Sequence, residues 1–145
     1  MVRIVAFVKT NSTANYEYIR LLAASSSAPA TYTGIGVGYD AGNHVVRSAH
    51  NGSNVTTTVV TAQQKADGIW LLMEMSAAAC RTAYKIGGSR PTTDSDWTHD
   101  YYTSLAVAPR WVGIQAQTEN TNGTHVCSAE GVDISYLDGA GMWLE

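Results

Sequence analysis

A short segment of the chain, residues 94–102, concentrates side chains that could bind a ligand. Its carboxylates are Asp94, Asp96 and Asp100. Its aromatic rings and its imidazole are those of Trp97, Tyr101, Tyr102 and His99. Carboxylate oxygens suit Ca²⁺, which takes about six to eight hard oxygen ligands. Aromatic rings suit the apolar C–H face of a sugar, and a histidine beside them could respond to pH. We therefore expect a calcium or sugar site in this segment.

The same residues also have a structural interpretation. Asp is common in turns, and Trp97 could anchor the segment in the core. The surrounding stretch, residues 87–109, is rich in Gly, Pro and Asp and shows no clear periodicity. A loop of this length in a compact domain is usually functional, or it contains a short strand or helix of its own. Both interpretations of the segment remain open at the level of sequence.

Catalytic motifs are missing from the chain. None of the five glutamates has a second carboxylate two residues away on the same predicted strand, so the acid–base pair of a glycoside hydrolase is not predicted. The sequence contains no G-x-S-x-G, no H-E-x-x-H and no P-loop. The histidines lie in separate segments, as His44, His50, His99 and His125. We expect a protein that is not an enzyme, with a glycoside hydrolase as a distant alternative.

The composition limits the number of domains and the classes of partner that we expect. A chain of 145 residues has room for one domain, and 45% apolar residues are enough to build its core. Charged residues make up only 14%, against roughly 25% in a typical soluble domain. The net charge of -3 gives no electrostatic reason to expect nucleic acid or an anionic membrane as a partner. No stretch approaches the roughly 20 apolar residues of a membrane span.

Alternation of apolar and polar residues predicts strands along the whole chain. The expected strands cover residues 2–9, 16–24, 32–40, 44–49, 55–61, 68–75, 80–86, 111–118 and parts of 125–137. Residues 69–86 could also form a helix, but their Trp, Tyr and Ile content favours strands. Residues 62–67 are expected to be a polar break. About nine or ten short strands predict a single all-β domain over residues 1–145, an antiparallel β-sandwich or jelly roll.

The strand at residues 32–40 has an unusual face. Ile35 and Val37 point to one side, whereas Gly34, Gly36 and Gly38 leave the other side without side chains. A neighbouring backbone, an aromatic ring or a ligand must come close to such a face. We favour structural packing as the explanation.

The second half of the chain resembles the concanavalin A-like lectin and glucanase sandwich, and its laminin-G-like modules in particular. The resemblance covers roughly residues 60–137 and rests on the order of short motifs. These are Trp70 to Met73, Tyr84, Asp96 with Trp97, Val112 to Ala116, and Val132 to Tyr136. The resemblance implies a sandwich with lectin-like binding, although the E-x-D-x-x-E motif of the glucanases is absent.

These observations favour a binding or structural protein. The first hypothesis is a virion surface protein of a phage, of decoration or fibre type, which would act as a homo-oligomer with capsid or other virion proteins as partners. The alternative is an extracellular carbohydrate-binding module with a glycan as its partner. Cys80 and Cys127 could pair in an oxidising compartment, but we favour two buried thiols on strands.

Overall fold

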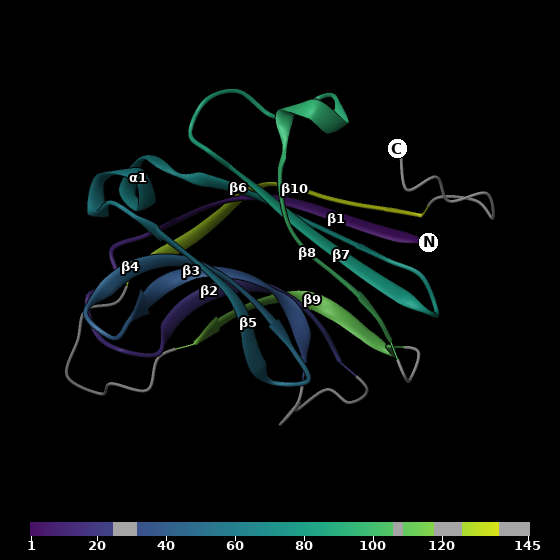
Figure 1. Cartoon of the computed structure of the whole chain (residues 1–145). Helices are drawn as coiled ribbons and strands as arrows, with labels where there is room; N and C mark the ends of the chain where they lie inside the picture. Colours follow the sequence, from purple (N-terminus) through teal and green to yellow (C-terminus); the bar gives the residue numbers. More distant parts are fainter. Residues whose placement is uncertain (25–31, 106–108, 118–125, 137–145) are drawn as a thin grey trace.

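Ten β-strands make up most of the chain that the structure describes, and they form two antiparallel sheets packed face to face (Figure 1). The structure is a computed structural model and describes residues 1–24, 32–105, 109–117 and 126–136. The β6 sheet, named after its central strand, contains in spatial order β10 (Cys127–Tyr136), β1 (Val2–Thr10), β6 (Ile69–Met75), β7 (Ala79–Ile86) and β8 (Thr98–Ser104). The β3 sheet contains β5 (Ser53–Val60), β4 (Asn43–His50), β3 (Thr33–Asp40), β2 (Glu17–Ala24) and β9 (Trp111–Gln117). The predicted all-β antiparallel sandwich is confirmed.

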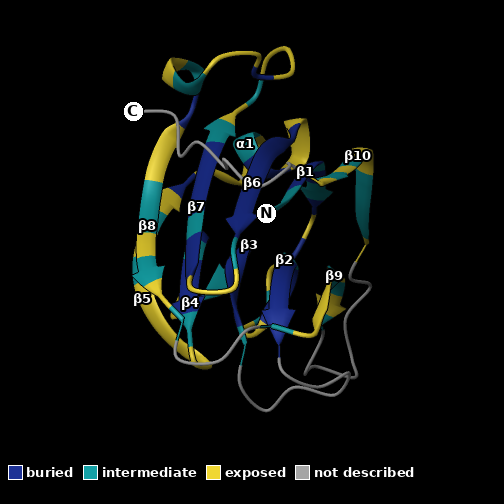
Figure 2. Ribbon diagram, turned by 90° about the vertical axis from the view of Figure 1, so that its right-hand side faces the viewer, coloured by how far each residue is buried: buried dark blue, intermediate teal, exposed yellow. Residues whose placement is uncertain are grey.

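The core lies between the two sheets and is built by the alternation seen in the sequence. Ile4 and Leu71 point inward from the β6 sheet and meet Leu21, Ile35 and Val37 from the β3 sheet. All five are almost fully buried. Burying an aliphatic side chain of this size contributes about 1.5–3 kcal/mol. Figure 2 shows the result, with the central strands buried and the edge strands exposed.

A second apolar cluster covers the outer face of the β6 sheet. It consists of Val5, Trp70, Leu72, Ala83 and Trp97. The first four come from β1, β6 and β7, and the fifth comes from the segment that precedes β8. This segment, residues 87–97, is also tied to the sheet by a hydrogen bond of 3.2 Å from the Trp70 indole to the Gly88 carbonyl. The outer face of the β6 sheet is therefore partly closed by residues 87–97.

One segment differs from the sequence-based expectation, and a second follows one of the two expected alternatives. Residues 62–67, predicted as a polar break, form the short helix α1 (Ala62–Asp67). It begins with a capping box, in which the Thr61 hydroxyl accepts from the Gln64 backbone and the Gln64 side chain accepts from the Thr61 backbone. The 87–109 stretch contains the turn η1 (Asp94–Asp96) and strand β8. This agrees with the expectation that the stretch contains a short strand or helix of its own, although the position of β8 is not predicted, because β8 is an edge strand with mostly exposed side chains.

The strand interpretation of residues 69–86 is confirmed, since they form β6 and β7 rather than a helix. Within the described ranges no helix has the length and apolar character needed to cross a membrane.

Candidate ligand-binding groove

Trp97 does not lie on the surface. Its side chain is 6% exposed and packs against Trp70, Leu72 and Ala83 in the outer cluster of the β6 sheet. A ring covered in this way cannot stack on a sugar. The structure therefore supports the alternative in which Trp97 is an anchor for its segment, and corrects its assignment to a sugar platform.

The two adjacent tyrosines point to opposite faces of β8, as successive residues of a strand must. Tyr102 is paired with Arg81 and is 60% exposed. Tyr101 is paired with Thr82, and its ring centroid lies 6.3 Å from that of His50 on β4. Tyr101 and Tyr102 therefore cannot form one aromatic platform, either together or with Trp97.

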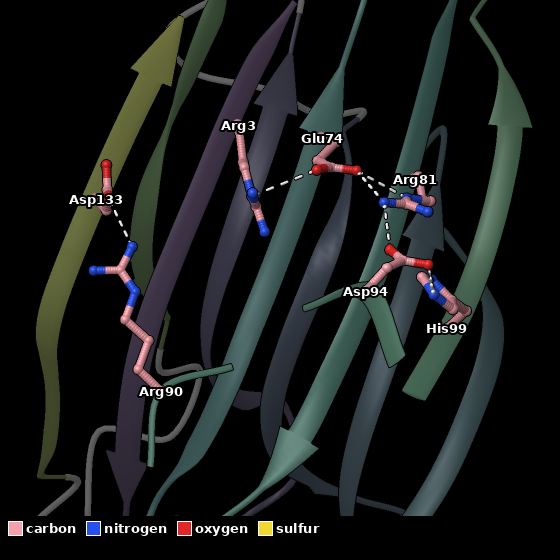
Figure 3. A network of polar contacts seen from close by, with 7 residues as sticks. All are labelled: Arg3, Glu74, Arg81, Arg90, Asp94, His99 and Asp133. Carbon is pink, nitrogen blue, oxygen red and sulfur yellow. Dashed lines mark hydrogen bonds and ion pairs between the residues drawn. The ribbon is translucent and has the colours of Figure 1, made fainter. Parts of the chain in front are cut away.

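A chain of charged side chains crosses the outer face of the β6 sheet (Figure 3). Glu74, whose side chain is only 4% exposed, lies 3.4 Å from Arg3 and 2.6 Å from Arg81. Arg81 continues to Asp94 at 3.1 Å, and the other carboxylate oxygen of Asp94 lies 3.1 Å from His99. Both oxygens of Asp94 are thus engaged in holding the η1 turn on the sheet. His99 is thus part of this network, and its role in a sugar site stays a prediction.

Asp100 points into the sandwich instead of toward Asp94. One of its oxygens accepts hydrogen bonds of 2.5 Å from both Ser48 and Thr56 on the facing sheet. The Ser48 hydroxyl is also 2.7 Å from the Thr82 hydroxyl on β7. Asp100 therefore joins the two sheets through a partly buried network of hydroxyl groups.

Asp96 caps its own turn. It accepts backbone hydrogen bonds of 2.9 Å from Thr93 and 2.8 Å from Thr92, which hold its pKa at about 2. The three predicted calcium ligands Asp94, Asp96 and Asp100 thus have separate structural roles. Over the described part of the chain, no three His, Cys, Asp or Glu side chains are grouped to hold a metal ion. Calcium binding stays a prediction, and the expected ligand set does not converge.

The two cysteines are free thiols on strands β7 and β10, and the expectation that both are buried holds for Cys80 alone. Cys80 is buried, and burial raises the pKa of its thiol to about 12. Cys127 is only partly buried.

An open groove of about 330 Å³ lies on the outer face of the β3 sheet, and none of residues 94–102 is among the described residues that line it. Its floor is the glycine stripe of β3, and its walls come from the neighbouring strands β2 and β4. The lining residues are Tyr16, Tyr18, Arg20, Tyr32, Gly34, Ile35, Gly36, Arg47, Ala49, Gly52, Asn54 and Gln117. The groove combines aromatic rings with donors and acceptors, which is typical of a ligand site.

The close approach of β2 explains the glycine stripe. A Cβ atom on Gly34 would lie 2.1 Å from the Leu21 carbonyl oxygen, and one on Gly38 would lie 2.4 Å from the Tyr18 ring. Gly36 is restricted in the same way, by the side chain and backbone of β2. The stripe is thus required by packing, as the sequence analysis favoured. Its consequence is a floor without side chains.

Two arginines flank this floor. Gly36 is the cross-strand partner of both Arg20 on β2 and Arg47 on β4. Adjacent strands are about 4.8 Å apart, so the two arginine Cα atoms lie roughly 10 Å from each other. Each arginine also bonds outward along the same row, Arg20 to Gln115 at 2.8 Å and Arg47 to Thr57 at 3.1 Å. The row therefore places two arginines on either side of a residue that has no side chain, and β2 lies too close to Gly36 for a Cβ atom to fit there.

Tyrosines hold the two arginines in place. The Arg20 guanidinium lies 4.1 Å from the centre of the Tyr32 ring and donates a hydrogen bond to the Tyr32 hydroxyl. Arg47 donates to the Tyr18 hydroxyl at 3.0 Å and pairs with Asp40 at 2.5 Å. Burial raises the pKa of Tyr18 to about 12, so this hydroxyl stays neutral near neutral pH. Oriented guanidinium groups lose little side-chain entropy when a ligand binds.

Tyr16 lines the groove with a strained backbone. Its φ of 65° is in the left-handed region, which is uncommon for a bulky residue. A hydrogen bond of 3.1 Å from its backbone N–H to the Tyr39 carbonyl holds this conformation. The side chain is 52% exposed.

Sequence reasoning identified the glycine face but missed Arg20 and Arg47 as its neighbours. Only the register of β2, β3 and β4 identifies these two arginines as neighbours, because it places both of them opposite Gly36. Alternation alone does not give register, because turns and bulges set it.

Comparison with known proteins supports the fold. No family model and no curated protein matches the chain. A solved structure that is similar is described as "The crystal structure of a functionally unknown protein from Saccharomyces cerevisiae". It shares 14% identity and a TM-score of 0.70 over 95% of this chain and 70% of the yeast chain. At this identity the likeness shows a common sandwich fold alone, and the resemblance to concanavalin A-like lectins stays a prediction.

Proposed function

We propose that this protein is a carbohydrate-binding domain whose ligand occupies the groove on the outer face of the β3 sheet. The observation that carries the proposal is the combination of an open floor with Tyr, Arg, Asn and Gln side chains around it. Sugars present an apolar C–H face and rows of hydroxyl groups. Aromatic rings suit the first, and planar guanidinium and amide groups suit the second.

The exposed Tyr16 ring supports this assignment. Backbone strain of its kind costs about 1–3 kcal/mol and tends to persist at binding sites. Here the strain places a half-exposed aromatic ring at the groove, where it can stack on a sugar.

The charge of the lining supports binding without catalysis. The described residues that line the groove contain two arginines and no Asp or Glu. Glycoside hydrolysis in most families uses a pair of carboxylates that flank the scissile bond. We therefore propose a non-catalytic domain.

Screening of a glycan array, followed by calorimetry on the oligosaccharides that bind, tests the proposal. Tyr16→Ala should weaken binding by about tenfold or more, because one lost stacking contact is worth about 1.4 kcal/mol. Tyr102→Ala is the matched control, since Tyr102 is equally exposed but lies on the edge strand of the other sheet. The proposal fails if no glycan binds, or if both variants bind as the unmodified protein does. Release of new reducing ends would contradict the non-catalytic assignment.

The predicted locations on a virion or outside a cell stay predictions, and a glycan groove suits either. Oligomeric state separates them, because a virion component is expected to form a symmetric oligomer and a module is expected to be a monomer. Light scattering coupled to size-exclusion chromatography measures this directly. Repeating the calorimetry with and without EDTA tests the predicted calcium requirement.

A further inference from the structure

We propose that β9 is a docking strand for a second copy of this chain, and that the two β9 strands pair antiparallel across a twofold axis. β9 ends the β3 sheet, so this pairing would join the β3 sheets of both copies into one continuous sheet. β9 and β10 end the two sheets along the same side of the sandwich (Figure 2). The inference goes beyond carbohydrate binding and does not depend on it.

The first argument is that β9 lacks the features that usually protect the edge of a sheet. Proteins commonly guard such an edge against a further strand with a β-bulge, a proline or charged side chains. Of the four edge strands in the described part of the chain, β5, β8 and β10 each have an irregular register with the strand beside them, as at a bulge. β9 pairs with β2 in an unbroken register over Trp111–Gln117, and it has no proline and no charged residue. Its edge therefore has the regular geometry that strand addition needs.

The second argument is that apolar side chains on this side of the sandwich are exposed. Ile114 pairs with Leu21 of β2, which is part of the core between the sheets. Because cross-strand partners share a face, Ile114 points inward too, and so does Val112 two residues before it. Both are nevertheless 36% exposed. On β10, Ile134 pairs with the buried Ile4 and is also exposed, so the core is not closed between β9 and β10.

Self-complementarity identifies the occupant as a second copy. A twofold interface brings the same patch of both copies together, so the patch must fit itself. With the axis at Ile114, the two Ile114 side chains meet, and Val112 lies opposite Ala116 of the other copy. The exposed Trp111 lies opposite Gln117. β9 opposes no like charges in this register because it carries none, although the whole chain has a net charge of -3.

The size of the contact predicts a dimer that dissociates on dilution. At about 3.3 Å per residue, the seven residues of β9 span about 23 Å. A contact of this length would need a width of about 35 Å to reach the roughly 800 Å² per partner of a standard interface. The two sheets of a sandwich lie only about 10 Å apart, so the contact is smaller than standard.

The twofold axis would stand perpendicular to the joined sheet, so the grooves of both copies would open on the same face. Five strand spacings separate the two β3 strands, which is about 24 Å. A dimer would therefore bind a surface of repeated glycans with both grooves at once. This consequence alone rests on the proposed function.

Sedimentation equilibrium of the full chain, from about 5 µM to about 500 µM, tests the pairing, and the average mass should rise from monomer toward dimer. Ile114→Lys places two like charges across the axis and should raise the dimer Kd at least about tenfold. Val59→Lys is the matched control, because Val59 is an exposed residue of β5, an edge strand that is also uncharged, and this change should leave the Kd unaltered. Circular dichroism and thermal unfolding establish that both variants are folded.

A disulfide locates the axis without a charged variant, so the proposal stays testable if Ile114→Lys does not fold. Directly opposite residues of paired strands have Cβ atoms about 4.5–5.5 Å apart. Ile114→Cys should therefore give a disulfide-linked dimer under mild oxidation, as seen on a non-reducing gel. Val59→Cys and the unmodified protein, which already contains Cys80 and Cys127, should give much less.

The outcomes separate this inference from the proposed function. A monomer at every concentration overturns the inference and leaves a strand of another protein as the alternative occupant of β9. A dimer that Ile114→Lys does not weaken, or that Val59→Lys weakens equally, overturns it as well, because the contact then lies elsewhere. Glycan binding is measured below the dimer Kd, so its absence would overturn the proposed function and not the dimer.

Discussion

Lys65 gives the sharpest prediction about stability, because this lysine is buried at the end of the sandwich. It belongs to α1 and is 1% exposed. Its ammonium group donates to the backbone carbonyl and the hydroxyl of Ser12, both at 2.6 Å, and to the Gly38 carbonyl at 3.3 Å. Burial lowers its pKa from 10.5 to about 8, although the nearby charge of Glu17 acts in the opposite direction.

The lowered pKa makes stability rise with pH. Between about pH 8 and pH 10.5 the folded protein holds fewer protons at Lys65 than the unfolded chain, so the free energy of unfolding increases in this range. Each pKa unit corresponds to about 1.4 kcal/mol, which gives about 3 kcal/mol for the whole range. From about pH 7 to about pH 10 the gain is about 2.5 kcal/mol, or roughly 7 °C in Tm for a chain of this size.

Urea unfolding of the unmodified protein and of Lys65→Met, measured side by side from about pH 7 to about pH 10, isolates this contribution. The difference in the free energy of unfolding between the two proteins should change by about 2.5 kcal/mol in favour of the unmodified protein as pH rises. Cys80 and Tyr18 have raised pKa values, which lower stability at high pH, but they are present in both proteins and cancel. Lys9→Met is the control, since the Lys9 side chain is 39% exposed.

A constant difference across this pH range would refute the reasoning. It would mean that the three hydrogen bonds to Ser12 and Gly38 compensate the burial of the charge fully. A slope of the same size in Lys9→Met would refute it as well, because the effect would then not belong to the buried lysine.

Three further substitutions test the packing. Gly34→Ala should prevent folding or cost more than about 2 kcal/mol, because its Cβ would lie 2.1 Å from the Leu21 carbonyl oxygen; soluble yield and urea midpoints measure this. Trp97→Ala should cost about 3–5 kcal/mol in urea unfolding and leave glycan affinity unchanged, since Trp97 is a buried anchor; weaker binding in the folded variant would contradict this role. Asp100→Asn should lower the free energy of unfolding by about 1–3 kcal/mol, because it replaces a charged acceptor of two hydroxyl donors; an unchanged midpoint would show that the link to Ser48 contributes little.

The sequence predicts those strands whose two faces differ in polarity. β1 and β6 alternate between residues that enter the central core, such as Ile4 and Leu71, and residues of the outer face. β8 has no such contrast, because Tyr101 and Tyr102 are partly or largely exposed on either face of an edge. α1 depends on a local capping box that begins at Thr61, which periodicity does not reveal.

Only the glycine stripe of the candidate site could be predicted from the sequence, for a related reason. A glycine stripe is visible along one strand, since it needs only the period of two residues. The pairing of Gly36 with Arg20 and Arg47 depends on the register of three strands, and each register depends on loops and on the close approach of β2. Residues 94–102, by contrast, carry suitable residue types but direct them to different places, as Asp94 and Asp100 show.

The two outer faces of the sandwich explain why the site lies where it does. The outer face of the β6 sheet is apolar at Trp70 and Leu72, so it needs a cover, and residues 87–97 supply one through Trp97. Residues 94–97, which the sequence suggested as part of a binding site, therefore lie in the segment that covers this face. The outer face of the β3 sheet has glycines in place of large apolar residues along β3, so it needs no such cover at the groove. The groove therefore leaves an open, polar surface on this sheet, and a Cβ atom at Gly36 would lie 2.7 Å from the Arg20 Cβ, so a larger residue there would disturb the pairing of β2 with β3.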